Sequence, residues 1–150
     1  KVKVGYPSRE EERLILDRMT GHPPSVEASV VGLDEIKAVR EAVQLVYLDD
    51  KVKNYIVDLV HASRNPDEVD LGDLVDLIEY GASPRATIFL ARAARAQAFI
   101  NRRAYVTPED VKTVGPDVLR HRIVVSYEAE AEEIDSEQIV QKLFEHVEVP

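Results

Sequence analysis

The sequence contains no cysteine. A disulfide framework and a thiolate metal site are therefore both excluded, and side-chain packing has to supply the stability. No apolar run approaches the roughly 18 residues of a membrane-spanning helix, and residues 1–5 lack the apolar stretch of a signal peptide. Since the absence of cysteine also permits an intracellular compartment, we expect a cytoplasmic protein with no membrane span.

Positive charge is scarce. The 150 residues include 19 Lys plus Arg against 28 Asp plus Glu, which gives a formal net charge of −9. This balance argues against nonspecific binding to nucleic acid or to an anionic membrane, because both need a basic surface. The hydrophobic share of 45% is typical of a folded chain with a real core, in one or two small globular units.

The common catalytic loops are missing as well. The sequence has no G-x-x-x-x-G-K-[ST], G-x-G-x-x-G, H-E-x-x-H or G-x-S-x-G segment. We therefore expect no independent catalysis by this chain. Its four histidines are dispersed, and we expect them at ordinary surface or boundary positions, with no metal site: His22, His61, His121 and His146.

What the sequence does contain is a series of helix signals. The clearest helix follows a cap at Asp49, where apolar residues recur at helical spacing in Val52, Tyr55, Ile56, Leu59 and Val60. A second periodic segment runs from Leu33 to Tyr47. Capping boxes or Ser/Thr-Pro pairs predict further helix starts at Ser8 with Glu11, Ser83-Pro84, Thr107-Pro108 and Asp135 with Gln138.

The remaining segments read as breaks or marginal elements. Residues 64–67 stop the Asp49 helix, residues 68–80 have room for one short helix, and Gly115-Pro116 is expected to end the helix that starts at Pro108. Lys1 to Val4 and Arg122 to Tyr127 read as short strands, and residues 128–133 as a solvated acidic linker. We predict an all-α fold, a small helical bundle with at most one or two short strands.

The most informative segment reads Gly-Ala-Ser-Pro-Arg-Ala from Gly81 to Ala86. Ser83 and Pro84 predict the start of a helix that runs to about Asn101, so Arg85 stands in its first turn. A cation there faces the positive end of the helix dipole, which costs roughly a few tenths of a kcal/mol unless an anion is close. Arg85 therefore needs a partner.

Two kinds of partner are open to Arg85. The free amides of a helix start together with a guanidinium form a natural receptor for a phosphate group, whose oxygens match the guanidinium fork. The alternative is an ion pair with a nearby carboxylate of Asp73, Asp76 or Glu79. The residues alone leave both open.

The predicted helix after Ser83 has two distinctive faces. Thr87, Leu90, Ala94 and Ala98 share one face, whose small side chains would let a neighbouring helix approach closely. The arginines gather elsewhere, either along one line of the helix or a little under a quarter turn away. This basic face could meet a nucleotide or a neighbouring subunit, or simply be solvated. Its central line is formed by Arg85, Arg92 and Arg103, and the displaced residues are Arg95 and Arg102.

These segments together resemble the C-terminal lid of the MoxR-type AAA+ ATPases. The resemblance is carried by Gly81–Ala86, Val52–Val60, Ala91–Ala96 and Tyr105–Val111, and it continues in Gly5–Glu12 and Val118–Arg122. It implies a helical lid that covers a bound nucleotide and moves with its hydrolysis state. It also implies that Arg85 is the sensor 2 residue, a catalytic and ATP-contacting group that reaches the γ-phosphate.

The resemblance further implies ATP and Mg²⁺ as cofactors of the intact protein, with none held by this fragment alone. The implied partners are an upstream AAA+ core of the same protein, further copies in a hexamer and a von Willebrand A domain protein. The implied role is chaperone-like remodelling, often to mature or insert metal cofactors. The chain departs from the family in lacking the P-loop, the Walker B acid, sensor 1 and an arginine finger, and residues 66–80 match poorly.

On this interpretation, residues 1–20 are the end of the AAA+ core and a connecting helix. Residues 21–122 are the helical lid, and residues 123–150 are a C-terminal extension with a final helix. A free-standing helical interaction module without nucleotide is the alternative, and an upstream G-x-x-x-x-G-K-[ST] segment would distinguish the two. A helix-turn-helix DNA binder is disfavoured by the negative charge.

Overall fold

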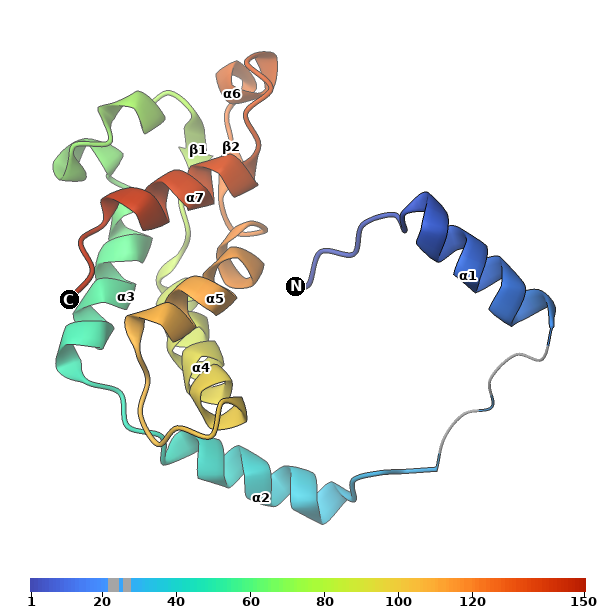
Figure 1. Cartoon of the computed structure of the whole chain (residues 1–150). Helices are drawn as coiled ribbons and strands as arrows, with labels where there is room; N and C mark the ends of the chain where they lie inside the picture. Colours follow the sequence, from blue (N-terminus) through green and yellow to red (C-terminus); the bar gives the residue numbers. More distant parts are fainter. Residues whose placement is uncertain (22–24, 26–27) are drawn as a thin grey trace. The chain divides into compact units, whose positions relative to one another are not determined.

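The computed structural model describes residues 1–21, 25 and 28–150 (Figure 1). The chain divides into two compact units, residues 2–39 and residues 40–150 together with Lys1. Within the described ranges, no helix is long and apolar enough to cross a membrane.

The first unit holds helix α1 (Arg9–Thr20) and the first part of helix α2 (Leu33–Gln44). Ser8 and Glu11 form the predicted capping box at the start of α1. Neither helix buries a residue, so the apolar side chains of α1 remain exposed: Leu14, Ile15, Leu16 and Met19. No second strand pairs with Lys1 to Val4 among the described residues, so the strand predicted there stays a prediction.

The second unit is a bundle of four longer helices (Figure 1). They are α3 (Asp50–Ala62), α4 (Pro84–Ile100), α5 (Pro108–Leu119) and α7 (Ser136–His146). Helix α4 packs along α5 and against α3, and α7 packs against both α5 and α3. The predicted caps at Asp49 and at Asp135 with Gln138 are confirmed.

The small-residue face of α4 is the centre of this packing. Leu90, Ala94 and Ala98 are fully buried as predicted, and Ala86 joins them in place of Thr87, which is only half-buried. Side chains of this size let two helices pack with closely spaced axes. The core formed around this face includes Tyr55, Ile56 and Leu59 of α3, Val111 and Leu119 of α5, and Ile139 and Leu143 of α7.

The region between α3 and α4 holds more structure than the single short helix expected in residues 68–80. Two 3₁₀ helices, η1 (Pro66–Val69) and η2 (Gly72–Leu74), lead into strand β1 (Ile78–Tyr80). Strand β1 pairs antiparallel with β2 (Val124–Val125), which lies inside the strand predicted for Arg122 to Tyr127. The prediction of a mainly helical fold with at most one or two short strands is confirmed.

Two predictions about the C-terminal third are wrong. Helix α5 does not end at Gly115-Pro116. A Cβ atom at Gly115 would lie 2.1 Å from Cζ of Phe144 in α7, so this glycine serves the contact between the two helices. The expected acidic linker contains helix α6 (Tyr127–Ala131), which begins where the Ser126 hydroxyl accepts from the Ala129 amide and which buries Ala129.

Candidate functional site

The start of α4 is fixed by close contact with the end of α3. At Gly81 a Cβ atom would lie 2.1 Å from the carbonyl oxygen of Ser63 and 2.8 Å from Cα of Arg64, so only glycine can pass there. The Ala82 amide then donates to the Ser63 hydroxyl at 3.0 Å, and Arg64 Nη1 donates to the Ala82 carbonyl at 2.9 Å. These contacts attach the segment Gly81–Ser83, here called the α4 strap, to α3.

Helix α4 begins at Pro84, directly after the strap, and Arg85 is its second residue. Its first turn contains no acidic residue, whereas the first turns of the six other described α-helices all contain at least one. Acidic side chains normally offset the positive end of the helix dipole. The start of α4 therefore carries uncompensated positive charge.

The Arg85 side chain is exposed and forms no ion pair within the described part of the chain. Asp73, one of the three carboxylates considered as its partner, instead binds Lys142 of α7 at 2.7 Å. Neither Asp76 nor Glu79 pairs with Arg85 either. The ion-pair alternative is therefore wrong, and the guanidinium is available to an anion from outside the chain.

The basic face predicted along α4 is only partly formed. The helix ends at Ile100, and Arg102 takes a left-handed conformation with φ of 57°. The amides of Arg102 and Arg103 bond back to the Phe99 and Ala98 carbonyls at 2.9 Å each, the pattern of a Schellman C-cap. This turn takes Arg102 and Arg103 off the helix, so their place in the basic face was predicted wrongly.

Arg103 has a structural partner. Its two terminal nitrogens donate to both carboxylate oxygens of buried Asp110, at 2.7 and 2.5 Å. Burial by itself would raise the pKa of Asp110, but the hydrogen bonds from Arg103 and from Thr107 outweigh burial and lower it. Arg103 therefore closes the bundle at the start of α5 and takes no part in the site at Arg85.

Arg92 and Arg95 do remain on α4, beside a groove between α3 and α4. The groove has a volume of about 440 Å³, and Lys53 of α3 lines it together with these two arginines. Its floor is apolar and includes Ile56 and Ala91. No carboxylate lines the groove, although Lys53 is paired at 2.7 Å with Asp50, which is not among the lining residues.

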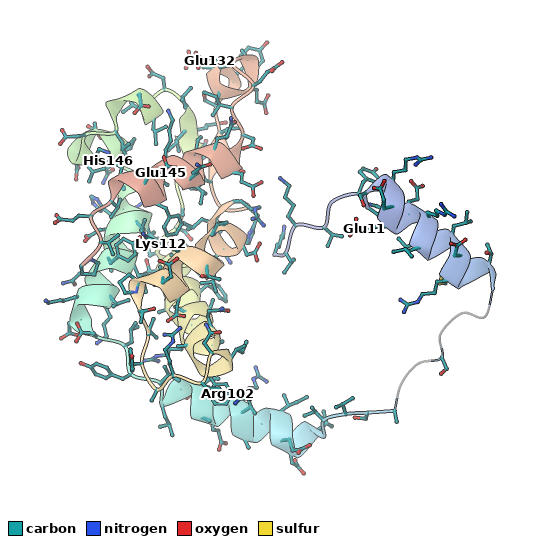
Figure 2. All side chains as sticks on the ribbon, in the orientation of Figure 1. Glu11, Arg102, Lys112, Glu132, Glu145 and His146 are labelled. Atoms are coloured by element: carbon teal, nitrogen blue, oxygen red, sulfur yellow. The ribbon has the colours of Figure 1, made fainter. Side chains whose placement is uncertain are left out.

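The described residues offer no metal site, since no three carboxylate or imidazole side chains gather closely enough to hold an ion. His61 lies in α3 near Asn65 and Glu68, and His121 follows α5, where burial lowers its pKa. Arg102 beyond α4 and His146 at the end of α7 lie far apart (Figure 2). The remaining histidine, His22, lies outside the described residues.

Sequence reasoning found Arg85 but missed the residues that hold the α4 strap before it. Ser63 and Arg64 were interpreted only as the end of α3, because the groups they bind at Ala82 come 18 or 19 positions later in the chain. The glycine at position 81 was the only available signal. A glycine directly before a helix start indicates a close approach without identifying the neighbour.

The comparisons with known proteins agree with this geometry. Residues 75–143 match the AAA lid domain family. The chain is 37% identical to Chaperone MoxR1 of Mycobacterium tuberculosis over 150 residues, all of this chain and 40% of that protein. It is 33% identical to Protein MoxR of Methylorubrum extorquens over 141 residues, 89% of this chain and 40% of that protein.

A crystal structure from Cytophaga hutchinsonii, described as that of a candidate ATPase, has the same fold. It matches with a TM-score of 0.90 at 36% identity, over 98% of this chain and 45% of that one. The chain thus spans less than half the length of the relatives it matches. With its helical bundle and its Gly-Ala-Ser-Pro-Arg helix start, the chain carries an AAA lid domain and is homologous over its whole length to part of the MoxR chaperones.

Proposed function

We propose that this chain closes over ATP held by an upstream P-loop core of the same protein, and that Arg85 contacts the γ-phosphate as the sensor 2 residue. The observation that carries this proposal is the exposed, unpaired guanidinium in the first turn of α4. No acid offsets the dipole there, so an incoming phosphate meets a positive end that nothing in the described chain neutralises.

The chemistry assigned to Arg85 is electrostatic. Negative charge develops on the oxygens of the transferring phosphoryl group, and a guanidinium held in place stabilises it without a costly reorganisation of solvent. The charge of arginine is permanent and its fork can bind two oxygens at once. Release of phosphate would remove this contact, so the lid could change position with the state of hydrolysis.

The other groups needed for hydrolysis are assigned to the core. The described residues contain no carboxylate cluster that fits Mg²⁺, so the metal would be held with the phosphates by the core. We further propose that the intact protein is a cytoplasmic hexamer that acts with a von Willebrand A domain protein in chaperone-like remodelling or cofactor insertion. The support for the chaperone-like role is the similarity to Chaperone MoxR1.

The proposal is tested by Arg85→Ala in the full-length protein. We expect kcat for ATP hydrolysis to fall on the order of 10²-fold, the loss typical when one preorganised donor is removed. Arg85→Lys should restore only part of the activity, because an ammonium cannot bind two oxygens as a fork. Arg92→Ala, which removes another exposed arginine of the same helix, is the matched control and should keep near-normal turnover.

Arg85→Ala should leave the unfolding temperature unchanged, because the side chain is exposed and forms no ion pair among the described residues. The purified 150-residue chain should show no ATP turnover. Normal turnover in full-length Arg85→Ala would contradict the assignment of Arg85. A full-length protein without a P-loop would instead favour the free-standing interaction module.

A further inference from the structure

The α4 strap is held by two side chains that lie at the end of another helix. Ser63 is the C-cap residue of α3, and its hydroxyl donates to the Val60 carbonyl at 2.7 Å while accepting from the Ala82 amide at 3.0 Å. Arg64 binds the carbonyl of the same alanine. Both backbone polar groups of Ala82 are thus bound by the end of α3.

The hydrogen bond between the Ser63 hydroxyl and the Ala82 amide is buried. Ser63 and Ala82 are both 0% exposed, so water cannot replace the Ser63 hydroxyl as the partner of the Ala82 amide. A buried amide that loses its partner stays unsatisfied unless the backbone moves. Removal of the hydroxyl should therefore displace the strap instead of merely exchanging one hydrogen bond for another.

The start of α4 has no side-chain cap of its own. The side chain of Ser83 makes no capping hydrogen bond, although its backbone has the extended conformation of an N-cap. Hydroxyl or carboxylate caps do hold the starts of α1, α3, α6 and α7. The side-chain hydrogen bonds that hold the start of α4 are therefore those from α3 to Ala82, and they act together with the burial of Ala86 in the core.

The path from this attachment to Arg85 is short and stiff. Only Ser83 and Pro84 separate Ala82 from Arg85, and the proline ring restricts φ at the first helical position. A shift of Ala82 therefore moves the base of the Arg85 side chain. Misplacement of a catalytic group by about 1 Å can lower a rate by as much as 10²-fold.

We propose that Ser63, assisted by Arg64, is a positioning residue that sets the reach of Arg85 toward its phosphate. This inference rests on the proposed function of Arg85. It makes the end of α3 part of the catalytic apparatus, although neither residue touches the nucleotide. A movement of α3 within the bundle would then change the contact of Arg85.

The test is a double-mutant cycle in the full-length protein, read by kcat for ATP hydrolysis and by the unfolding temperature. Ser63→Ala should lower kcat by roughly 10-fold, which is less than Arg85→Ala does, because the guanidinium is displaced but still present. Ser63→Ala added to Arg85→Ala should lower kcat no further, whereas its effect on the unfolding temperature should be the same in both backgrounds. Hydrogen exchange at the Ala82 amide should be faster in Ser63→Ala.

Ser126→Ala is the matched control. That hydroxyl also donates to a backbone carbonyl, of Asp76 at 2.6 Å, and accepts from a backbone amide, of Ala129 at 3.2 Å, but it serves α6 and not α4. It should lower the unfolding temperature without lowering kcat. Arg64→Ala, at an exposed position, gives a second variant should Ser63→Ala fail to fold.

The two proposals fail in different ways. Normal turnover in Arg85→Ala would remove the function of Arg85 and the role of Ser63 together. If Arg85→Ala is impaired but Ser63→Ala and Arg64→Ala hydrolyse ATP normally, only the positioning role is overturned. The same holds if Ser63→Ala lowers kcat by the same factor with and without Arg85, since Ser63 would then act by another route.

Discussion

A methyl group at Gly81 probes the contact between the α4 strap and α3 most directly. In Gly81→Ala the new Cβ would lie 2.1 Å from the Ser63 carbonyl oxygen, 2.6 Å from its carbonyl carbon and 2.8 Å from Cα of Arg64. All three are backbone atoms at the end of a packed helix, so none can rotate away. Either the strap or the last turn of α3 has to move.

The expected cost has two parts. Overpacking of a tight site costs about 1 to 3 kcal/mol, and a buried Ala82 amide separated from Ser63 costs about 1 to 3 kcal/mol more. We expect a loss of about 3 kcal/mol in the free energy of unfolding, because the strap can relax partly toward solvent. For a chain of this size that corresponds to a fall of roughly 6 to 12 °C in the unfolding temperature.

Two further glycines provide a graded comparison. A Cβ at Gly72 would meet nothing within 4 Å, so Gly72→Ala should be neutral or should stabilise by up to about 1 kcal/mol through the unfolded state. The three atoms nearest to a Cβ at Gly115 all belong to the ring of Phe144, which is a half-buried side chain and can turn. There the gain of about 1 kcal/mol from alanine in a helix offsets part of the repacking cost.

The assay is urea and thermal unfolding of the three variants beside the unaltered chain. The expected order of stability is Gly72→Ala, then Gly115→Ala, then Gly81→Ala. If Gly81→Ala and Gly72→Ala unfold at the same urea concentration and temperature, the strap is not pressed against α3. The attachment of Ala82 would then not determine where α4 begins.

Two more predictions concern the bundle. Hydrogen bonds from Arg103 and Thr107 lower the pKa of Asp110 despite its burial. The stability that this carboxylate supplies is therefore present at neutral pH and is lost as the pH falls below the ordinary aspartate pKa of about 4. Asp110→Asn should flatten that part of a plot of unfolding free energy against pH. Leu90→Ala, at a fully buried site on α4, should lower the free energy of unfolding by about 2 to 5 kcal/mol in chemical denaturation. Ile88→Ala, at a side chain that is 53% exposed, should change it by under about 1 kcal/mol. Equal effects of the two substitutions would place the core elsewhere.

The helix starts could be predicted from the sequence because their signals are local. The cap at Asp49 and the capping boxes at Ser8 and Asp135 each involve residues no more than three positions apart, and all three formed as predicted. The buried face of α4 followed from helical spacing alone, apart from the exchange of Thr87 for Ala86.

The errors arose where a distant partner overrides a local signal. Gly115 resembled a helix end, but it is required by Phe144, which lies 29 positions later in the chain. Arg103 was assigned to the basic face of α4, but the Schellman turn and the buried carboxylate of Asp110 direct it elsewhere. Strand β1 was missed because a three-residue strand becomes stable only through β2, more than 40 residues away.

The sequence by itself thus determined where α1, α3, α4, α5 and α7 begin, most of the buried face of α4, and that a lone arginine stands at the start of α4. Those features depend on the geometry of one helical turn, which any segment of the chain carries within it. Only the tertiary structure decided that Arg85 has no carboxylate partner in the described chain and that Ser63 and Arg64 hold the strap before it. These are contacts between residues far apart in the chain, and they exist only after the bundle has brought α3 and α4 together.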